Sequence, residues 1–195
     1  MGGEVCRTYT RSGGAMKFIE TILKGACIIE IERLEDDRGF FARTFCQRDF
    51  KAHGLNPRLV QCSISYNRRR GTLRGMHYQA SPMSEAKLVR CTQGAIYDVI
   101  IDLRKESPAY CKWTAVELSA DNYMMLYIPE GFAHGYQTLE DDTDVFYQMS
   151  QYYASVFARG VWYDDPALGI TWPLDEKIVS ESDKKYPFLN LVEIK

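Results

Sequence analysis

Apolar and polar positions alternate in short runs along most of the chain. From position 17 onward, runs of five to nine residues rich in Val, Ile and Tyr are separated by Gly, Pro, Asn and Asp, a pattern typical of β-strands and turns. The best helical signal is short, residues 47–53, and Gly54 ends it. Seven or more strands at this spacing predict an all-β antiparallel sandwich or barrel with a few short helices. The clearest runs are residues 26–31, 59–65, 87–91, 95–103, 113–118, 124–128 and 145–149.

The length and organisation indicate one domain. The chain has 195 residues, of which 46% are hydrophobic, enough for a sizeable core. There is no internal repeat and no linker, so we expect a single domain over residues 16–195. Residues 1–15 lack an apolar segment and predict a flexible N-terminal extension without a secretion signal.

The charge balance excludes two classes of partner. The 24 basic and 26 acidic side chains leave a net charge of −2, which offers neither a basic field for nucleic acid nor a polybasic membrane patch. No run of about 18 apolar residues is present, so we expect no membrane span. The six cysteines form no CxxC pair, and we expect reduced thiols in a cytoplasmic protein.

The run at 95–103 carries an acidic residue on an apolar face. Strand alternation puts Ile96, Asp98, Ile100 and Asp102 on one side. Asp98 is then either a buried, hydrogen-bonded carboxylate or part of a cavity lining, and the sequence leaves both readings open.

Three histidines are the first candidates for chemistry. His53 lies in the charged helix-and-turn segment, so we expect it at the surface. Residues 129–134, PEGFAH, fit the PxGxxH motif of cupin barrels, which indicates a cupin-type barrel or jelly roll. The strand that should carry the other cupin ligands offers only His77. Two histidines without a placed carboxylate make a poor transition-metal site, so we expect no metal.

Several further motifs occur together in one order. They are DRGFF at 37–41, LRGMHYQ at 73–79, KLVRC at 87–91, IPEGFAHG at 128–135, tyrosines at 147, 152 and 153, DDPALGI at 164–170 and WP at 172–173. In this order they resemble the dTDP-4-dehydrorhamnose 3,5-epimerase family over residues 17–175. The resemblance implies an isomerase of deoxysugar biosynthesis, in the dTDP-rhamnose pathway, that inverts C3, C5 or both of a nucleotide-linked 4-keto-6-deoxyhexose without any cofactor. It also implies a homodimer that exchanges an N-terminal strand, and residues 17–31 are the candidate segment.

The reaction defines the groups that it needs. Carbons 3 and 5 flank the C4 ketone, so removing either proton gives an enolate; this requires a base with a pKa near neutral, a cation at O4 and an acid on the opposite face. The resemblance makes His77 the base, Asp165 its partner, Lys87 the cation and Tyr147 the acid. It also implies five substrate-binding residues: Arg38, Gln61, Arg74, His134 and Tyr153.

Residues 72–79, TLRGMHYQ, raise a geometric problem. In a regular strand Arg74 and His77 point to opposite faces, whereas the resemblance puts both in the pocket. Gly75 tolerates unusual backbone angles. We therefore predict a break in the alternation near Gly75, with His77 pointing inward towards Asp165.

The sequence leaves the nucleotide and the epimerised carbon of the substrate undetermined. Arg43 stands where the family commonly has Glu, and Ala158 where an acidic residue is expected, so neither the nucleotide nor the choice between 3-, 5- and double epimerisation is settled. Two other functions fit the same barrel: a nucleotide-sugar 3,4-ketoisomerase, and a sugar-binding cupin without turnover. Binding alone needs no base and acid on opposite faces, which favours the epimerase.

Overall fold

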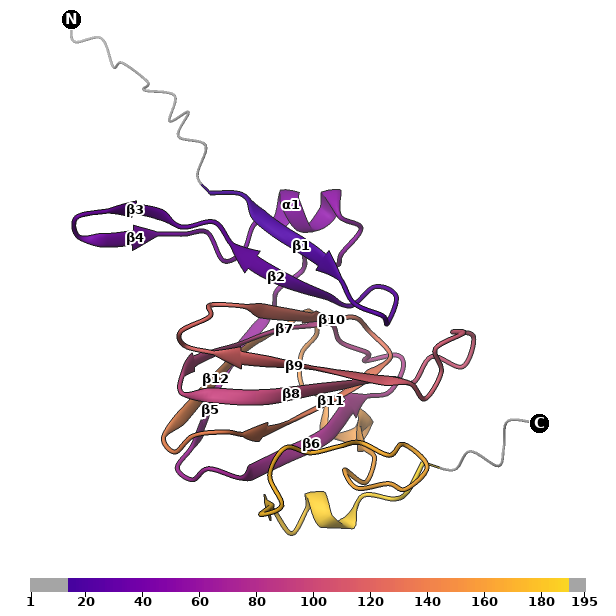
Figure 1. The fold of residues 1–195 in the computed structure, drawn as a ribbon. Helices are drawn as coiled ribbons and strands as arrows, with labels where there is room; N and C mark the ends of the chain where they lie inside the picture. Colours follow the sequence, from indigo (N-terminus) through magenta and orange to yellow (C-terminus); the bar gives the residue numbers. More distant parts are fainter. Residues whose placement is uncertain (1–13, 190–195) are drawn as a thin grey trace, which may run out of the picture.

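A computed structural model describes residues 14–189, so the predicted extension at 1–15 lies almost entirely outside the described residues (Figure 1). Two antiparallel sheets dominate the fold. Sheet I has the order β1 (Met16–Glu20), β2 (Cys27–Ile31), β10 (Met125–Ile128), β7 (Lys87–Gln93), β12 (Thr143–Met149) and β5 (Gln61–Asn67). Sheet II has the order β13 (Ala158–Gly160), β6 (Thr72–Gln79), β11 (Phe132–Thr138), β8 (Ala95–Asp102) and β9 (Trp113–Ser119).

The remaining elements are short. The strands β3 (Leu34–Asp36) and β4 (Gly39–Phe41) form a separate hairpin, and β14 (Ile178–Val179) pairs in parallel with β6. The helical pieces are α1 (Gln47–Ala52) and the 3-10 turns η1 (Ser155–Phe157) and η2 (Asp183–Lys185). The prediction of an all-β, cupin-type fold with short helices is confirmed. Within the described residues no helix is long and apolar enough to cross a membrane.

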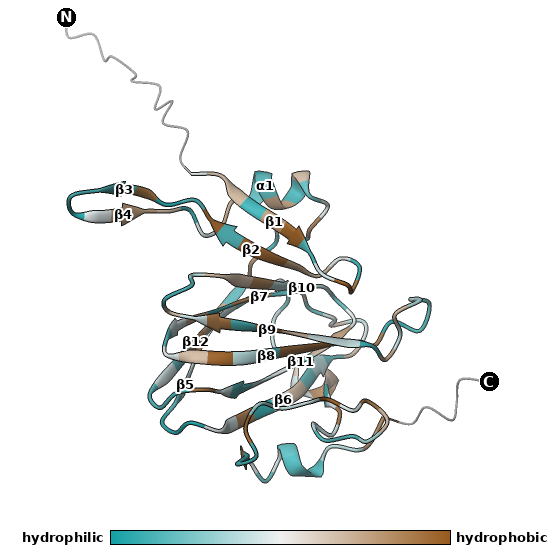
Figure 2. Cartoon of the chain, viewed as in Figure 1, coloured by the Kyte–Doolittle hydropathy of each residue, from teal (hydrophilic) through white to brown (hydrophobic). Residues whose placement is uncertain are grey.

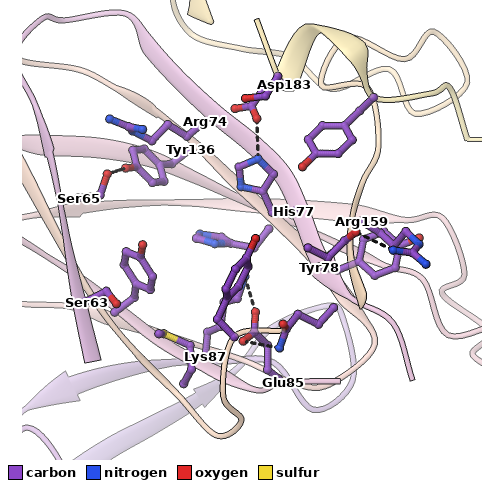
Figure 3. Close-up of a pocket in the computed structure, with 18 of the residues that line it drawn as sticks. Ser63, Ser65, Arg74, His77, Tyr78, Glu85, Lys87, Tyr136, Arg159 and Asp183 are labelled. Carbon is purple, nitrogen blue, oxygen red and sulfur yellow. Dashed lines mark hydrogen bonds and ion pairs between the residues drawn. The ribbon is translucent and has the colours of Figure 1, made fainter. Parts of the chain in front are cut away.

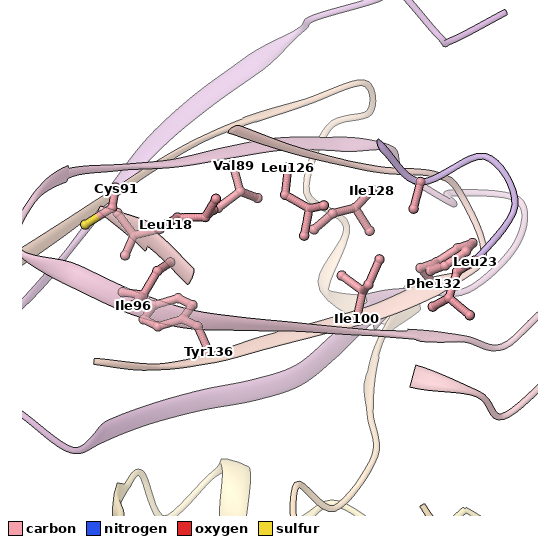
Figure 4. Packing of buried hydrophobic residues seen from close by; sticks show 12 residues of the cluster. Leu23, Val89, Cys91, Ile96, Ile100, Leu118, Leu126, Ile128, Phe132 and Tyr136 are labelled. Carbon is pink, nitrogen blue, oxygen red and sulfur yellow. The ribbon is translucent and has the colours of Figure 1, made fainter. Parts of the chain in front are cut away.

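The main core lies between the two sheets. Val89 and Leu126 of sheet I face Ile96 and Ile100 of sheet II, and all four are at most 1% exposed (Figure 4). Figure 2 shows hydrophobic and hydrophilic colours interspersed along the strands, and hydrophilic colour at most turns. Burial of this apolar area is the main term that holds the sheets together.

Sheet II is covered on its other face as well. Val99 and Ile101 point away from the main core and pack with Leu73, Met76 and the C-terminal segment, which includes the buried residues Val161, Leu168, Ile170 and Trp172. Both faces of β8 are therefore buried, which explains its nearly continuous apolar sequence. The same C-terminal segment passes along β6 through β14 and continues into η2.

The β3–β4 hairpin projects from the body of the molecule (Figure 1). All six of its strand residues are exposed. Strands β1 and β2, by contrast, belong to the chain's own sheet I, and Phe50 of α1 packs against Phe18 and Tyr127 there. The hairpin meets the body through Phe40, whose ring lies edge-on to Tyr123 with 5.0 Å between centroids. The exchange of residues 17–31 in a homodimer stays a prediction.

Candidate active site

A pocket of about 550 Å³ opens between the two sheets. Strands β5, β7 and β12 line it from sheet I, and β6, β11 and β13 from sheet II. Seven of the nine predicted site residues line this pocket: Gln61, Arg74, His77, Lys87, His134, Tyr147 and Tyr153. Asp165 and Arg38 do not.

Strand β6 breaks its alternation at Gly75, as predicted. Gly75 has a φ of +130°, a region that L side chains rarely adopt, and the pairing of β6 with β11 shifts register between His134 and Tyr136. Arg74 and His77 consequently both line the pocket, whereas Met76 is buried in the cluster beneath sheet II. A Cβ at position 75 would lie 2.5 Å from the Cα of Gly135, so the backbones of β6 and β11 meet closely here.

The carboxylate partner of His77 is Asp183. His77 Nε2 lies 2.9 Å from Asp183 Oδ1 (Figure 3), and Asp183 Oδ2 accepts a hydrogen bond of 3.3 Å from the Gly75 N–H. The side chain of His77 is 40% exposed and that of Asp183 is 8% exposed. Because a carboxylate only accepts, it orients the imidazole with a proton on Nε2 and leaves Nδ1 as the basic nitrogen.

Asp183 is held in its charged form. Burial alone raises the pKa of its carboxyl group, but hydrogen bonding and charge from His77, with hydrogen bonds from Gly75 and Ser180, outweigh burial and lower that pKa. The Ser180 hydroxyl also accepts the backbone N–H of Asp183 at 3.0 Å, at the start of η2. The local sequence around Asp183 has a Ser three positions before the Asp, which is typical of a turn in a polar segment. This pattern indicates the turn but does not link Asp183 to His77.

Asp165 was predicted as the partner of His77, and this prediction is wrong. Asp165 is 3% exposed, and its carboxylate accepts backbone N–H groups from Ala167 at 2.9 Å and from Leu189 at 2.5 Å. Both oxygens are therefore engaged in the C-terminal segment. Because Leu189 follows Asp183 by six positions, Asp165 anchors the segment that carries the true partner of His77.

Lys87 and Tyr147 approach the pocket from sheet I, opposite the His77 strand. Burial raises the pKa of the Tyr147 phenol; nearby Arg74 lowers it and Glu85 raises it, with a net increase. The phenol therefore keeps its proton at neutral pH and can donate it. Lys87 forms an ion pair of 3.2 Å with Glu85, which also lines the pocket and was not singled out from sequence.

His134 and Arg74 are each tied to a buried neighbour. His134 Nε2 lies 2.5 Å from Asp98 Oδ1, and Asp98 is fully buried. Of the two readings of Asp98, the buried, hydrogen-bonded carboxylate is the one observed. Arg74 donates from Nε to Asn67 at 2.7 Å and from Nη2 to the Tyr66 carbonyl at 3.4 Å, which leaves other guanidinium N–H groups for a ligand.

The rim of the pocket includes Tyr153 and Gln61. Tyr153 is 65% exposed, and Gln61 accepts its backbone N–H at 3.1 Å. Tyr186 lies edge-on to His77, with 5.6 Å between ring centroids. Arg159 also lines the rim, next to the position where an acidic residue was expected. His53 is exposed, as predicted, and stacks on Phe18.

Arg38 lies in the turn of the β3–β4 hairpin, away from the pocket of its own chain. Its guanidinium pairs with Asp36 at the surface, and it does not line the pocket. The predicted role in substrate binding is therefore not fulfilled within one chain.

Among residues 14–189, no group of three or more His, Cys, Asp or Glu side chains is placed to hold a metal ion. The expectation of a reaction without metal or cofactor stays a prediction, which metal analysis of the purified protein tests.

Comparison with known proteins decides the family. The family model described as dTDP-4-dehydrorhamnose 3,5-epimerase matches residues 20–190. The chain belongs to this family. A dTDP-4-dehydrorhamnose 3,5-epimerase of Methanothermobacter thermautotrophicus is 44% identical over 173 residues, which span 87% of this chain and 92% of that protein.

Solved structures of the epimerase family agree with the fold. The enzyme of Bacillus anthracis, solved with TDP and PPi bound, has a TM-score of 0.87 and 42% identity, covering 90% of this chain and all of that one. The enzyme of Legionella pneumophila, in complex with dTDP-4-keto-L-rhamnose, has a TM-score of 0.85 and 37% identity, covering 91% and 95%.

Proposed function

We propose that the chain is a cofactor-independent epimerase that inverts C3 and C5 of a dTDP-linked 4-keto-6-deoxyhexose through an enolate. As a member of the epimerase family it is an isomerase. One observation carries the mechanism: His77 on β6 and Tyr147 on β12 line the same pocket from facing sheets. Inversion requires a base and an acid on opposite faces of the sugar, and this division between sheets supplies them.

The first step is proton removal by His77. With Nε2 bound to Asp183, the lone pair of Nδ1 takes the proton from C3 or C5, and the ionised carboxylate stabilises the imidazolium that forms. The electron pair of the C–H bond moves into the sugar and places negative charge on O4.

Lys87 then stabilises the enolate oxygen. An ammonium fixed in a pocket that excludes part of the solvent acts where charge develops and needs no reorientation during the step. Tyr147 returns a proton from the other face, and its raised pKa keeps it a donor at neutral pH. His77 then loses its extra proton to solvent and Tyr147 regains one from solvent, and repetition at the second carbon gives the double inversion.

Nucleotide recognition is assigned to the pocket rim. The relatives solved with TDP, or with dTDP-4-keto-L-rhamnose, support a dTDP-linked substrate for this chain. The exposed ring of Tyr153 is placed to stack on a nucleotide base, and the remaining N–H groups of Arg74 suit an anionic diphosphate.

A homodimer accounts for the position of Arg38. The projecting hairpin exposes Leu34, Phe40 and Phe41, apolar side chains that a second copy would cover. We place this hairpin, in the dimer, at the pocket of the partner, where Arg38 binds the diphosphate.

The five described cysteines are free, which fits the expected cytoplasmic location.

The test is incubation with dTDP-4-keto-6-deoxyglucose in deuterated water, followed by NMR of the sugar. We expect deuterium at C3 and C5 and an inverted product. Movement of the carbonyl to C3 would indicate a 3,4-ketoisomerase instead. Tight binding without exchange would indicate a sugar-binding cupin, and exchange only with CDP-, UDP- or GDP-linked ketosugars would overturn the assigned nucleotide.

A further inference from the structure

Lys87 has a charged partner inside the pocket. Its Nζ lies 3.2 Å from Glu85 Oε1, and the two side chains are only 12% and 10% exposed (Figure 3). The surface pair of Arg69 and Glu176 has the same separation of 3.2 Å, but its side chains are 64% and 71% exposed. Charges withdrawn from water interact much more strongly than exposed ones, so the Lys87–Glu85 pair has the greater effect on the position of its cation.

The Glu85 carboxylate is itself fixed by a hydrogen bond from Gln79. Its second oxygen, Oε2, accepts from Gln79 Nε2 at 3.2 Å, and Gln79 is 4% exposed. The same amide nitrogen also faces the carbonyls of Met83 at 3.0 Å and Tyr152 at 3.2 Å, and the amide oxygen accepts the Ala154 N–H at 2.6 Å. These contacts fix the orientation of the amide and, through it, the carboxylate.

A lysine needs such support to stabilise an oxyanion. Its ammonium sits on a flexible four-carbon stem, with three donors that rotate freely. Holding the stem in one rotamer costs conformational entropy, and a misplacement of about 1 Å costs up to about 100-fold in rate. A nearby fixed carboxylate restricts where the ammonium can lie.

We propose that Glu85 is a positioning residue, which acts on the reaction through Lys87. Its carboxylate holds the Lys87 ammonium at the point in the pocket where the enolate oxygen forms. The inference rests on the proposed function. It adds to the His77–Asp183 pair and Tyr147 a Gln79–Glu85–Lys87 chain, which supports the oxyanion site independently of the His77–Asp183 pair. Glu85 itself does not contact the reacting atoms.

The test is a double-mutant cycle between Glu85→Gln and Lys87→Met, with exchange and turnover measured on dTDP-4-keto-6-deoxyglucose. Glu85→Gln keeps the volume and the hydrogen bond to Gln79 but removes the charge. It should lower kcat by about 10- to 100-fold with little change in KM. In the Lys87→Met background the same substitution should change kcat by less than about twofold, because coupled residues are not additive.

Equal losses in both backgrounds would overturn the inference, since Glu85 would then act elsewhere, for example through the pKa of Tyr147. An unchanged kcat, or an effect on KM alone, would overturn it too. Glu85→Asp, which retains the charge, should recover most of the lost activity, and Glu176→Gln should behave as wild type. Circular dichroism and thermal unfolding verify that each variant folds. Absence of exchange in the wild type would instead overturn the proposed function, and this inference with it.

Discussion

The His77 imidazole meets the Asp183 carboxylate at 2.9 Å, although 106 positions separate the two residues. The parallel pairing of β14 with β6 brings the C-terminal segment alongside the His77 strand, and η2 then turns Asp183 towards the imidazole. Gly75 contributes a second hydrogen bond to the same carboxylate, so the break in β6 both exposes His77 to the pocket and helps to hold its partner.

Replacing Asp183 should impair the chemistry. Asp183→Asn keeps the size of the side chain but removes the charge that stabilises the imidazolium, so kcat should fall by roughly 10²- to 10³-fold. The measurement is steady-state turnover together with the rate of deuterium exchange. A variant with wild-type exchange would show that His77 does not depend on this carboxylate.

Replacing Asp165 should have the opposite profile. Asp165→Asn weakens two buried, charge-assisted hydrogen bonds to backbone N–H groups, so the free energy of unfolding should fall by about 1–3 kcal/mol. The folded variant should keep most of its kcat at low temperature. Urea unfolding and turnover, measured on Asp165→Asn and Asp183→Asn side by side, separate the anchoring role from the catalytic one.

Tyr147→Phe should uncouple exchange from inversion. His77 still removes and returns the proton on one face, so deuterium enters the sugar, whereas inversion falls by about 100-fold or more without the donor on the other face. Burial raises the pKa of the phenol above its usual value near 10, so in the wild type the ratio of inversion to exchange should stay constant from pH 7 to about pH 9.5. A ratio that declines across this range would contradict the assignment.

Gly75→Ala should cost both stability and activity. The new Cβ would lie 2.5 Å from the Cα of Gly135, at a positive φ, so we expect a loss of more than about 2 kcal/mol in unfolding free energy, and a lower kcat because His77 shifts. Gly54→Ala is the matched control. Gly54 also has a positive φ, +71°, but a Cβ added there would meet nothing within 4 Å, so only the backbone strain of about 1 kcal/mol is expected. Equal losses in the two variants would mean that the close approach of β6 and β11 is not needed.

The proposed dimer predicts complementation between two inactive or weakened chains. Arg38→Ala should raise KM for the nucleotide sugar. Refolding it together with His77→Ala should give hybrid dimers in which one pocket has both His77 and the partner's Arg38, restoring roughly a quarter of the sites. No recovery of activity in the mixture would contradict an Arg38 contribution across the dimer.

The family resemblance identified the parts of the site that lie within contiguous motifs. His77, Lys87, Tyr147 and the break at Gly75 all lie in strands whose motifs are contiguous, and the structure brings the three side chains to one pocket. The partner of His77 was missed because it is set by topology. Nothing around Asp183 reveals that β14 will pair with β6, whereas Asp165 lies in a conspicuous motif that the structure uses for anchoring.

Arg38 shows the other limit of the sequence. The resemblance implied a role in substrate binding, but the contacts of an exposed hairpin turn depend on what covers that hairpin. The described fold also contains strands of two or three residues, β13 and β14, which are too short to predict from their own sequence and which pair with β6.

Proton abstraction by His77 is tested most simply by solvent deuterium incorporation into dTDP-4-keto-6-deoxyglucose, followed by NMR for the wild type and His77→Ala in parallel. We expect deuterium at both C3 and C5 with the wild type, and a rate at least about 10³-fold lower with the folded variant. Equal incorporation by the two proteins, or none by the wild type, would contradict a His77-initiated epimerisation.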